Sequence, residues 1–370
     1  MMIKEDRLTE RFLELVKISS PSLHERKVGD CILKILREIG LEATEDGAGV
    51  AVGGDCGNIT VFLRGNGKRT VLFSAHMDTV GPCEKINPVV TDGVVHTDGT
   101  SVLGGDDKSG IVVLLEAAQA VLENDLDRPD VVLTFSIGEE IGLLGAKNFA
   151  IEQYKPDFIY VLDTGGKPGT AVTKAPNSAN GWLKVIGKAA HAGRPEGGIN
   201  ALYVASHAIA GMKLGRVDEE TTANIGIVNG GQAGNIVMPD VRMKYEARSF
   251  SPLKLETLLK ETKELFEKTA AEYGAKFEYD VRISYQGFDW PEGSEILQPV
   301  KTACENIGLP HTVLSGGGGS DANIYNHKGF PAINLSTGMD KVHTVDESIA
   351  IADMIDAARL IVELIGVLAR

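Results

Sequence analysis

The chain has 370 residues, with 37 Lys and Arg against 51 Asp and Glu, so its formal net charge at neutral pH is −14. At about 150 residues per domain, this length corresponds to about two domains. Its 43% hydrophobic residues are enough for a folded core and exclude a disordered chain. The acidic balance argues against nucleic acid or an anionic membrane as a partner, because those surfaces require clustered Lys and Arg.

The cysteines and the start of the chain indicate where the protein acts. Cys31, Cys56, Cys83 and Cys304 are far apart and form no CxxC pair, so neither a thiolate zinc site nor a disulfide framework is indicated. The first residues are charged and amphipathic, without the apolar core of a signal peptide. No stretch reaches the roughly 18 apolar residues that a membrane span requires. We therefore expect a soluble, cytoplasmic protein.

The outer parts of the chain alternate between helical and strand patterns. Apolar residues at helical spacing predict helices over 8–19 and 23–39, and the second pattern ends at Gly40. Further along, apolar runs predict strands over 70–75, 131–137, 158–162 and 332–335, and helical spacing predicts helices over 109–122 and 349–368. Such an alternation predicts an α/β fold, with a mixed, mostly parallel sheet flanked by helices.

The middle of the chain has a different pattern. It predicts a strand, a helix, two strands, a helix that begins at Ser251-Pro252, and a final strand, over residues 182–188, 201–212, 223–228, 241–248, 252–274 and 277–284. This β-α-β-β-α-β order is the ferredoxin-like arrangement. We therefore predict a discontinuous first domain, residues 1–176 and 287–370, and a second domain, residues 177–286, inserted into it.

Polar side chains follow the predicted strands of the first domain. The carboxyl ends of the strands in an open α/β sheet form its ligand crevice, so we expect these side chains to converge. Acidic residues also stand just before the helix predicted over 109–122, and a histidine follows the last strand. The set comprises His76, Asp78, Asp106, Asp107, Glu139, Glu140, Asp163 and His343.

Each of these fragments alone has an ordinary structural interpretation. Asp107 before a helix is typical of a helix cap, and Glu139-Glu140 after a strand is typical of a solvated turn. Together, however, several carboxylates and two histidines at one edge of a sheet repel one another unless cations neutralise them. Imidazole nitrogen with carboxylate oxygen suits zinc, with manganese or cobalt as possible substitutes.

The ordered motifs resemble a known family. They are SAHMDTV over residues 74–80, GGDDKSG over 104–110, GEE over 138–140, Asp163, HAG over 191–193, and His343. In this order they resemble the two-zinc exopeptidases, which include peptidase T, carboxypeptidase G2, acetylornithine deacetylase and succinyl-diaminopimelate desuccinylase. The resemblance covers nearly the whole chain. The GGDDKSG form, with aspartate where the deacylase branch tends to have methionine, is most similar to peptidase T.

The resemblance implies a centre of two Zn²⁺ ions per subunit. His76 and Asp163 would bind one ion, Glu140 and His343 would bind the other, and Asp106 would bridge both. Three carboxylates and two neutral imidazoles carry −3 against the +4 of the ions. The remaining positive charge can hold a bridging hydroxide and polarise a carbonyl.

Neighbouring residues receive supporting roles from the same resemblance. Asp78 would accept the other ring N–H of His76 and fix its tautomer. Glu139 has no ligand role left, so it would act as the general base. Members of the family hold the peptide bond after the bridging aspartate in the cis form, which implies a cis bond between Asp106 and Asp107.

The inserted domain is implied to be a lid that binds substrate. His191 would stabilise the oxyanion of the tetrahedral intermediate, and Arg248 would bind a substrate carboxylate through its bidentate fork. Asn235 matches another substrate contact, and Gly318 lies in a glycine run that resembles a backbone anion-binding turn. Lid domains of this family often dimerise through an exposed strand edge and a helix, so a homodimer is implied.

The function predicted from the sequence is metal-dependent hydrolysis of short peptides, as in a peptidase T-like tripeptide aminopeptidase. An N-acyl amino acid deacylase or a carboxypeptidase of the same family remains an alternative, because these differ only in the pocket that binds each end of the substrate. A non-enzymatic relative would have lost Glu139 or a ligand, and all of these positions are filled. An oxidoreductase is disfavoured, since Gly104-Gly105-Asp106 does not continue into a GxGxxG fingerprint.

Overall fold

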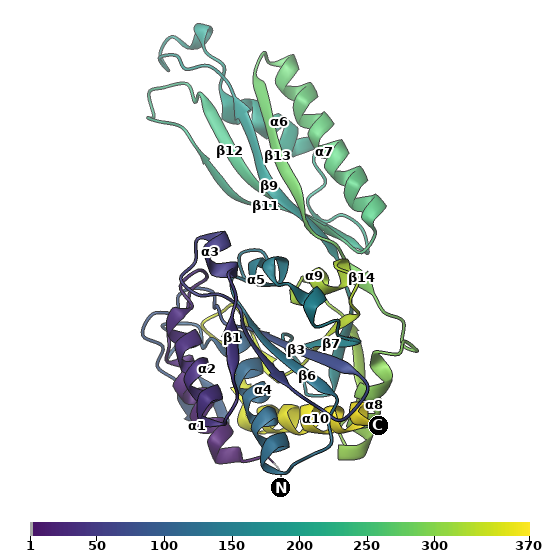
Figure 1. Ribbon diagram of the computed structural model, residues 1–370. Helices are drawn as coiled ribbons and strands as arrows, with labels where there is room; N and C mark the ends of the chain where they lie inside the picture. Colours follow the sequence, from purple (N-terminus) through teal and green to yellow (C-terminus); the bar gives the residue numbers. More distant parts are fainter. Residues whose placement is uncertain (1–2) are drawn as a thin grey trace. The chain divides into compact units, whose positions relative to one another are not determined.

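A computed structural model describes residues 3–370 of the chain, which divide into two compact units (Figure 1). The first unit holds the chain up to Lys174 together with Asp289–Gly316 and Ser320–Arg370. The second unit holds Ala175–Phe288 and the short run Gly317–Gly319. Its main segment extends the predicted insertion, residues 177–286, by two residues at each end.

The first unit is built on a large sheet. Its strands are β1 (Ala43–Glu45), β2 (Ile59–Leu63), β3 (Thr70–His76), β6 (Asp130–Ser136), β7 (Phe158–Val161), β8 (Thr170–Ala175), β14 (Phe288–Asp289), β15 (Thr312–Ser315) and β16 (Ala332–Leu335). They follow the order β1-β2-β6-β3-β7-β16-β8-β14, with β15 beside β8. Strand β3 runs parallel to both β6 and β7, while β2 runs antiparallel to β6 and β16 antiparallel to β8. The predicted mixed, mostly parallel sheet is confirmed.

Helices cover both faces of this sheet. They are α1 (Glu5–Val16), α2 (Arg26–Glu38), α3 (Ala48–Val52), α4 (Gly105–Glu123), α5 (Leu144–Asn148), α8 (Leu297–Ile307), α9 (Asp321–His327) and α10 (Ile351–Ala369). The chain passes from β3 through α4 to β6, and then back through α5 to β7 on the other side of β3. Such crossovers are right-handed. The connection from β3 to β6 and the connection from β6 to β7 cross the sheet in opposite directions, so α4 and α5 lie on opposite faces of the sheet. Strand β3 therefore marks the point where the winding reverses.

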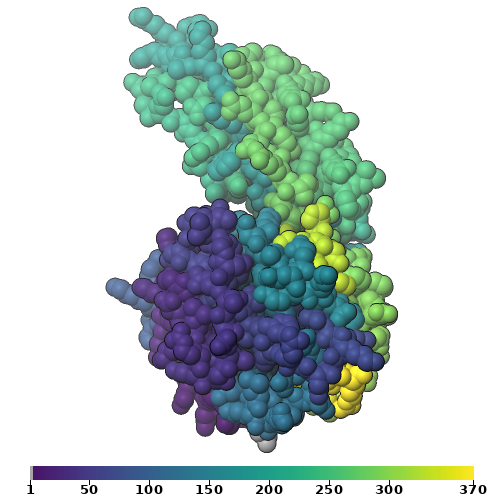
Figure 2. Space-filling view, viewed as in Figure 1, coloured from purple at the N-terminus to yellow at the C-terminus, as the bar shows by residue number. Residues whose placement is uncertain are grey.

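The packing of the helices agrees with this arrangement. Helix α10 lies beside α4 and α8, and α9 packs against β7 and β16 (Figure 1). Helix α3, in purple, and helix α5, in teal, contact each other although they are far apart in the sequence. In Figure 2, purple and teal segments lie side by side on one face of the first unit. Every residue of β3 after Thr70 is buried, as expected for a strand with neighbours and helices on all sides.

A smaller sheet in the first unit has the order β17-β18-β5-β4. It is formed by short strands with the bounds Val89–Thr91 (β4), Val94–His96 (β5), Met339–Asp340 (β17) and Ser348–Ala350 (β18). The pairing of β5 with β18 brings the segment before the GGDDKSG motif next to the segment after His343.

The second unit is an antiparallel sheet covered by two helices. Its elements are β9 (Asn177–Ile186), α6 (Ala201–Gly211), β10 (Gly215–Arg216), β11 (Thr221–Gly230), β12 (Asp240–Ser249), α7 (Pro252–Glu272) and β13 (Lys276–Tyr285). The strand order is β10-β11-β12-β9-β13. Alternate residues such as Leu183, Met243 and Tyr245 are buried in a core that includes residues of both helices. With the two-residue β10 set aside, the chain order is β-α-β-β-α-β.

One local expectation was wrong. The helical pattern predicted from residue 23 begins only at Arg26, so His24 lies outside the helix. Its ring Nδ1 is 3.6 Å from Asp55 Oδ2 on the surface. Within residues 3–370, none of the helices combines the length and the apolar character that a membrane crossing requires.

Candidate metal centre

The predicted site residues of the first unit lie at the carboxyl ends of three neighbouring strands. Strand β3 ends at His76, Glu139-Glu140 follow the end of β6, and Asp163 follows the end of β7. Because β3 pairs in parallel with both neighbours, these ends meet at one edge of the sheet. This edge is the ligand crevice of an open α/β sheet, at the strand where the winding reverses.

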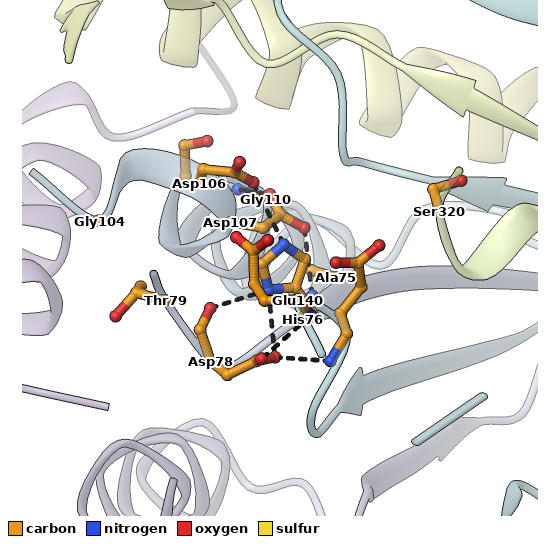
Figure 3. Close-up of polar contacts among 12 residues, drawn as sticks. Ala75, His76, Asp78, Thr79, Gly104, Asp106, Asp107, Gly110, Glu140 and Ser320 are labelled. Carbon is orange, nitrogen blue, oxygen red and sulfur yellow. Dashed lines mark hydrogen bonds and ion pairs between the residues drawn. The ribbon is translucent and has the colours of Figure 1, made fainter. Parts of the chain in front are cut away.

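Asp106 lies between two imidazoles. Its Oδ1 is 3.2 Å from Nε2 of His76, and its Oδ2 is 3.1 Å from Nε2 of His343. His343 Nε2 is also 3.1 Å from Oε1 of Glu140. Figure 3 shows Asp106 and Glu140 close to the His76 ring. The two carboxylate oxygens of Asp106 thus face different histidines, as a carboxylate shared by two cations would do.

Two groups of side chains could each hold a metal ion. One group is His76, Asp106 and Glu140, and the other is His76, Glu139 and Asp163; within each group the donor atoms lie within 4.8 Å of one another. His343 is in contact with Asp106 and Glu140, and its side chain is 51% exposed. The second group contains Glu139, to which the sequence prediction gave no ligand role.

The electrostatics of the centre are those of crowded carboxylates. Burial, followed by the charge of Asp163, raises the pKa of Glu139 well above its usual value. Burial and the charge of Asp106 raise the pKa of Asp163 in the same way. Burial also opposes ionisation of Asp106, but hydrogen bonds from His343 and His76 lower its pKa. The nearby carboxylates of Asp106 and Glu140 raise the pKa of His343 to about 10.

These donors fit divalent metal ions. Among the residues that the structure describes, Glu140 Oε1 is a buried oxygen without a hydrogen-bond partner, although His343 Nε2 faces it at 3.1 Å. When two side chains bind the same cation, both direct their lone pairs at it. Their ligand atoms then lie close together without a hydrogen bond between them. The mixture of imidazole nitrogen and carboxylate oxygen suits zinc, manganese or cobalt, and cations would relieve the repulsion between the carboxylates.

Asp78 accepts hydrogen bonds from backbone N–H groups and also contacts the His76 ring. The nearest acceptor to His76 Nδ1 is the main-chain oxygen of Asp78 at 2.9 Å, and the expected acceptor, the carboxylate Oδ1, lies at 3.5 Å. The carboxylate instead accepts the N–H of Glu139 at 2.9 Å, the N–H of Glu140 at 3.2 Å and the hydroxyl of Ser22 at 2.6 Å. A ring whose Nδ1–H is bonded in this way would present an unprotonated Nε2 to a metal ion at the centre.

Other buried carboxylates hold the ligand loops and were not identified from the sequence. Glu347 is 2% exposed and accepts the N–H of Gly104 at 2.8 Å and the N–H of Asp106 at 2.9 Å. Asp107, which one interpretation treated as a helix cap, accepts the N–H of Gly110 at 3.1 Å and also that of His76 at 3.2 Å. The peptide bond between Asp106 and Asp107 is cis, as the resemblance implied.

The residues expected to bind substrate all lie in the second unit. His191 forms a bridge with Ile236, and the N–H of Ala192 donates to the oxygen of Asn235 at 2.9 Å, so His191 and Asn235 lie close together. Arg248 is ion-paired with Glu246 and donates from Nη1 to the oxygen of Gly317 at 2.9 Å, beside Gly318. The structure thus brings these four residues together as two pairs, while the metal-ligand candidates lie in the first unit.

The chain is similar in sequence to known proteins. YqjE of Bacillus subtilis, which is uncharacterized, is 38% identical over 98% of this chain and 99% of its own. Peptidase T of Fusobacterium nucleatum is 29% identical over 75% of this chain and 68% of its own.

Two solved structures cover the whole of both chains. A tripeptidase from Staphylococcus aureus has 37% identity and a TM-score of 0.94. Aminopeptidase PepT from Bacillus cereus has 38% identity and a TM-score of 0.90. The predicted likeness to peptidase T is therefore confirmed. The peptidase family M20/M25/M40 matches residues 72–366, and this chain belongs to that family.

Proposed function

We propose that this metallopeptidase is an exopeptidase that removes the N-terminal residue from short peptides, in the manner of a tripeptide aminopeptidase. The observation that carries the proposal is Asp106, whose two oxygens each face a different histidine, beside Glu140 and Asp163. The similar structures titled tripeptidase and aminopeptidase PepT support the choice of substrate.

We assign the ligands as the resemblance implied. His76 and Asp163 would hold one ion, Glu140 and His343 would hold the other, and Asp106 would contribute an oxygen to each. We propose Zn²⁺ as the physiological metal, with Mn²⁺ or Co²⁺ as substitutes, because the donors are nitrogen and oxygen without sulfur. When bound, such ions lower the pKa of water and polarise a carbonyl.

The residues of the chain supply the proton transfers. Glu139 is the general base, which takes a proton from the attacking water and returns it to the leaving amine, so no covalent intermediate forms. Asp78 keeps Glu139 in place by accepting the backbone N–H of Glu139, and it keeps His76 in one tautomer.

We propose that the second unit binds the substrate. His191 would donate to the developing oxyanion, Asn235 would bind the peptide backbone, and Arg248 would pair with the substrate carboxylate. Gly318 would contribute to an anion-binding turn next to Arg248, consistent with its place beside that guanidinium.

We also propose a homodimer and a cytoplasmic location. Beyond the pairing of β10 with Ala223 and Thr222, strand β11 has no outer neighbour among the described residues, and it exposes Ile227 and Val228 by 51% and 52%. Such an edge suits pairing with a second copy. The four cysteines are all free thiols, as is usual in a reducing compartment.

Metal analysis tests the proposal directly. The purified protein should hold about two equivalents of divalent metal and lose its peptidase activity on chelation. Asp106→Ala should disturb both sites, whereas His76→Ala or Asp163→Ala should lose one ion. Asp280→Ala, on the exposed strand β13, is the control and should keep both ions. Full occupancy in Asp106→Ala would exclude its bridging role.

A further inference from the structure

The turn Gly138–Glu140 carries both a proposed base and a proposed ligand, and all of its backbone N–H groups are accepted by carboxylates. Asp78 accepts the N–H groups of Glu139 and Glu140. Glu25 Oε1 accepts the N–H of Gly138 at 3.0 Å, across 113 residues of sequence. Each of these hydrogen bonds fixes the distance between the turn and the side-chain oxygen that accepts it. Two distant segments therefore determine where this turn lies.

Glu25 is completely buried, which is unusual for an acid without a basic partner. The same Oε1 also accepts the N–H of Leu23 at 2.9 Å. Its second oxygen, Oε2, is buried and has no hydrogen-bond partner among the described residues. Burying a carboxyl group in this way costs free energy, so a purely structural account must find a local purpose for it.

A helix cap is the obvious local purpose, and the structure does not support it. Glu25 immediately precedes α2, but its side chain makes no capping hydrogen bond to that helix. The N–H of Arg26, in the first turn, is bonded to Asp55 Oδ1 at 3.0 Å instead. The side chain of Glu25 is thus directed away from its own helix and toward the turn of the metal centre.

The segment that precedes α2 makes other contacts to the same centre. The hydroxyl of Ser22 donates to Asp78 Oδ2 at 2.6 Å, and the N–H of Thr79 donates to the oxygen of Ser20 at 2.9 Å. Residues 20–25 therefore contact both Asp78, which holds Glu139 and Glu140, and Gly138, which precedes them.

We propose that Glu25 is a positioning residue for the hydrolytic reaction: by accepting the N–H of Gly138 it fixes the turn that aims Glu139 at the attacking water. The proposal rests on the proposed function for the role of Glu139. It requires the reach of the Glu25 oxygen and does not require its charge.

Two substitutions separate reach from charge. Glu25→Gln keeps an oxygen at the same distance and removes the charge. Glu25→Asp keeps the charge but withdraws the oxygen by about one C–C bond, about 1.5 Å. We expect Glu25→Gln to retain kcat on a tripeptide within about threefold. A displacement of about 1 Å can cost a hundredfold in rate, so we expect Glu25→Asp to lose about ten- to a hundredfold in kcat, with KM nearly unchanged.

Hydrogen exchange supplies a readout that does not depend on activity. Mass spectrometry of the peptide spanning 138–140 should show faster deuterium uptake in Glu25→Asp than in the parent or in Glu25→Gln. Glu116→Gln is a control for the loss of a buried carboxylate, because Glu116 is equally buried and also accepts a backbone N–H, that of Lys4, although this variant additionally breaks the ion pair with Arg7. It should change neither kcat nor exchange in the turn.

The outcomes are distinct. Parental exchange and kcat in Glu25→Asp would overturn the proposal, as would a Glu25→Gln protein as impaired as Glu25→Asp, since charge would then be the requirement. If the parent protein cleaves no peptide at all, the proposed function fails. The exchange of the turn still shows, by itself, whether Glu25 holds it.

Discussion

Glu139 and Glu140 are adjacent in sequence, yet the roles that we propose for them differ. Glu140 points an unpartnered oxygen at His343, whereas Glu139 has a pKa raised by burial and by Asp163. We predict that Glu139→Gln keeps both metal ions and lowers kcat by a factor of at least about 10², because an amide cannot take the proton. Glu140→Gln should instead weaken metal binding. Metal analysis alongside kinetics distinguishes the two, and a near-normal kcat in Glu139→Gln would contradict the mechanism.

The buried Glu25 carboxyl also predicts a pH dependence of stability. Burial, with a further contribution from the charge of Asp78, raises its pKa from 4.5 to about 7. Between these values the folded chain holds a proton that the unfolded chain releases. Glu25 therefore makes the folded state less stable as pH rises through this window, by about 1.4 kcal/mol per unit.

Glu25→Gln removes this contribution. We predict that the free energy of unfolding, measured by urea denaturation, falls less between pH 4.5 and pH 7 in Glu25→Gln than in the parent at equal metal content. An identical fall in both proteins would show that Glu25 is ionised throughout the window.

The sequence predicts the site residues that follow the ends of strands. It misses the residues whose side chains accept hydrogen bonds from backbone N–H groups. His76, Glu140 and Asp163 are predictable because apolar strands end just before them and the sheet brings the ends together. Glu25 and Glu347 bond to N–H groups 113 and more than 240 residues away. No local periodicity or spacing records such a contact.

At the scale of elements, the first helix is fastened to the helix that follows the metal loop. Arg7 of α1 donates from Nε to Oε2 of Glu116 at 2.7 Å and from Nη2 to Oε1 at 2.8 Å, and Glu116 on α4 is fully buried. Removing Arg7 would leave the buried Glu116 carboxylate with the more distant guanidinium of Arg11, at 3.8 Å, and the N–H of Lys4, so most of the compensation of its charge would be lost. We predict that Arg7→Ala lowers the free energy of unfolding by about 3 kcal/mol, measured by urea denaturation.

An exposed ion pair on α2 provides the comparison for this prediction. Lys34 and Glu38 are 3.8 Å apart, with both side chains more than half exposed. Lys34→Ala should therefore change the free energy of unfolding by less than about 0.5 kcal/mol. Equal effects in Arg7→Ala and Lys34→Ala would mean that the contact between α1 and α4 contributes little.

The long elements are predicted well, and the deviations have physical causes. The helix predicted over 109–122 is assigned from Gly105, but Asp106 and Asp107 have non-helical backbone angles, so regular helix begins near the predicted start. Strand β9 begins at Asn177, before the predicted start at residue 182. The prediction missed the first residues of this strand because they are small and polar. At Gly181 a Cβ atom would lie 1.9 Å from the oxygen of Asp280, so packing, and not hydrophobicity, selects these residues.

The shortest strands are not predicted at all. Strands β4, β5, β17 and β18 have two or three residues each, which is too short for alternation to be recognised. Strand β5 pairs with β18 across about 250 residues of sequence, and β4 and β17 extend this sheet by pairing with their sequence neighbours β5 and β18.

At the scale of the whole molecule, each unit has a large hydrophobic core of its own, and a small separate cluster of Cys83, Ile86 and Val102 lies in the first unit. The ends of the insertion are tied together, because the N–H of Gly287 donates to Asn177 Oδ1 at 2.9 Å. A domain whose ends meet can be inserted without separating the strands on either side. This explains how the sequence pattern of one domain resumes after 110 residues of another.

The central claim, that this two-metal exopeptidase acts on a free N-terminus, is tested most directly by the products of one tripeptide. A tripeptide with three different residues and its N-acetylated twin should be incubated with metal-loaded protein, and the fragments should be identified by mass spectrometry. We predict that the free tripeptide loses its N-terminal residue first and that the acetylated twin is not cleaved. Release of the C-terminal residue first, or cleavage of the acetylated peptide alone, would contradict the account.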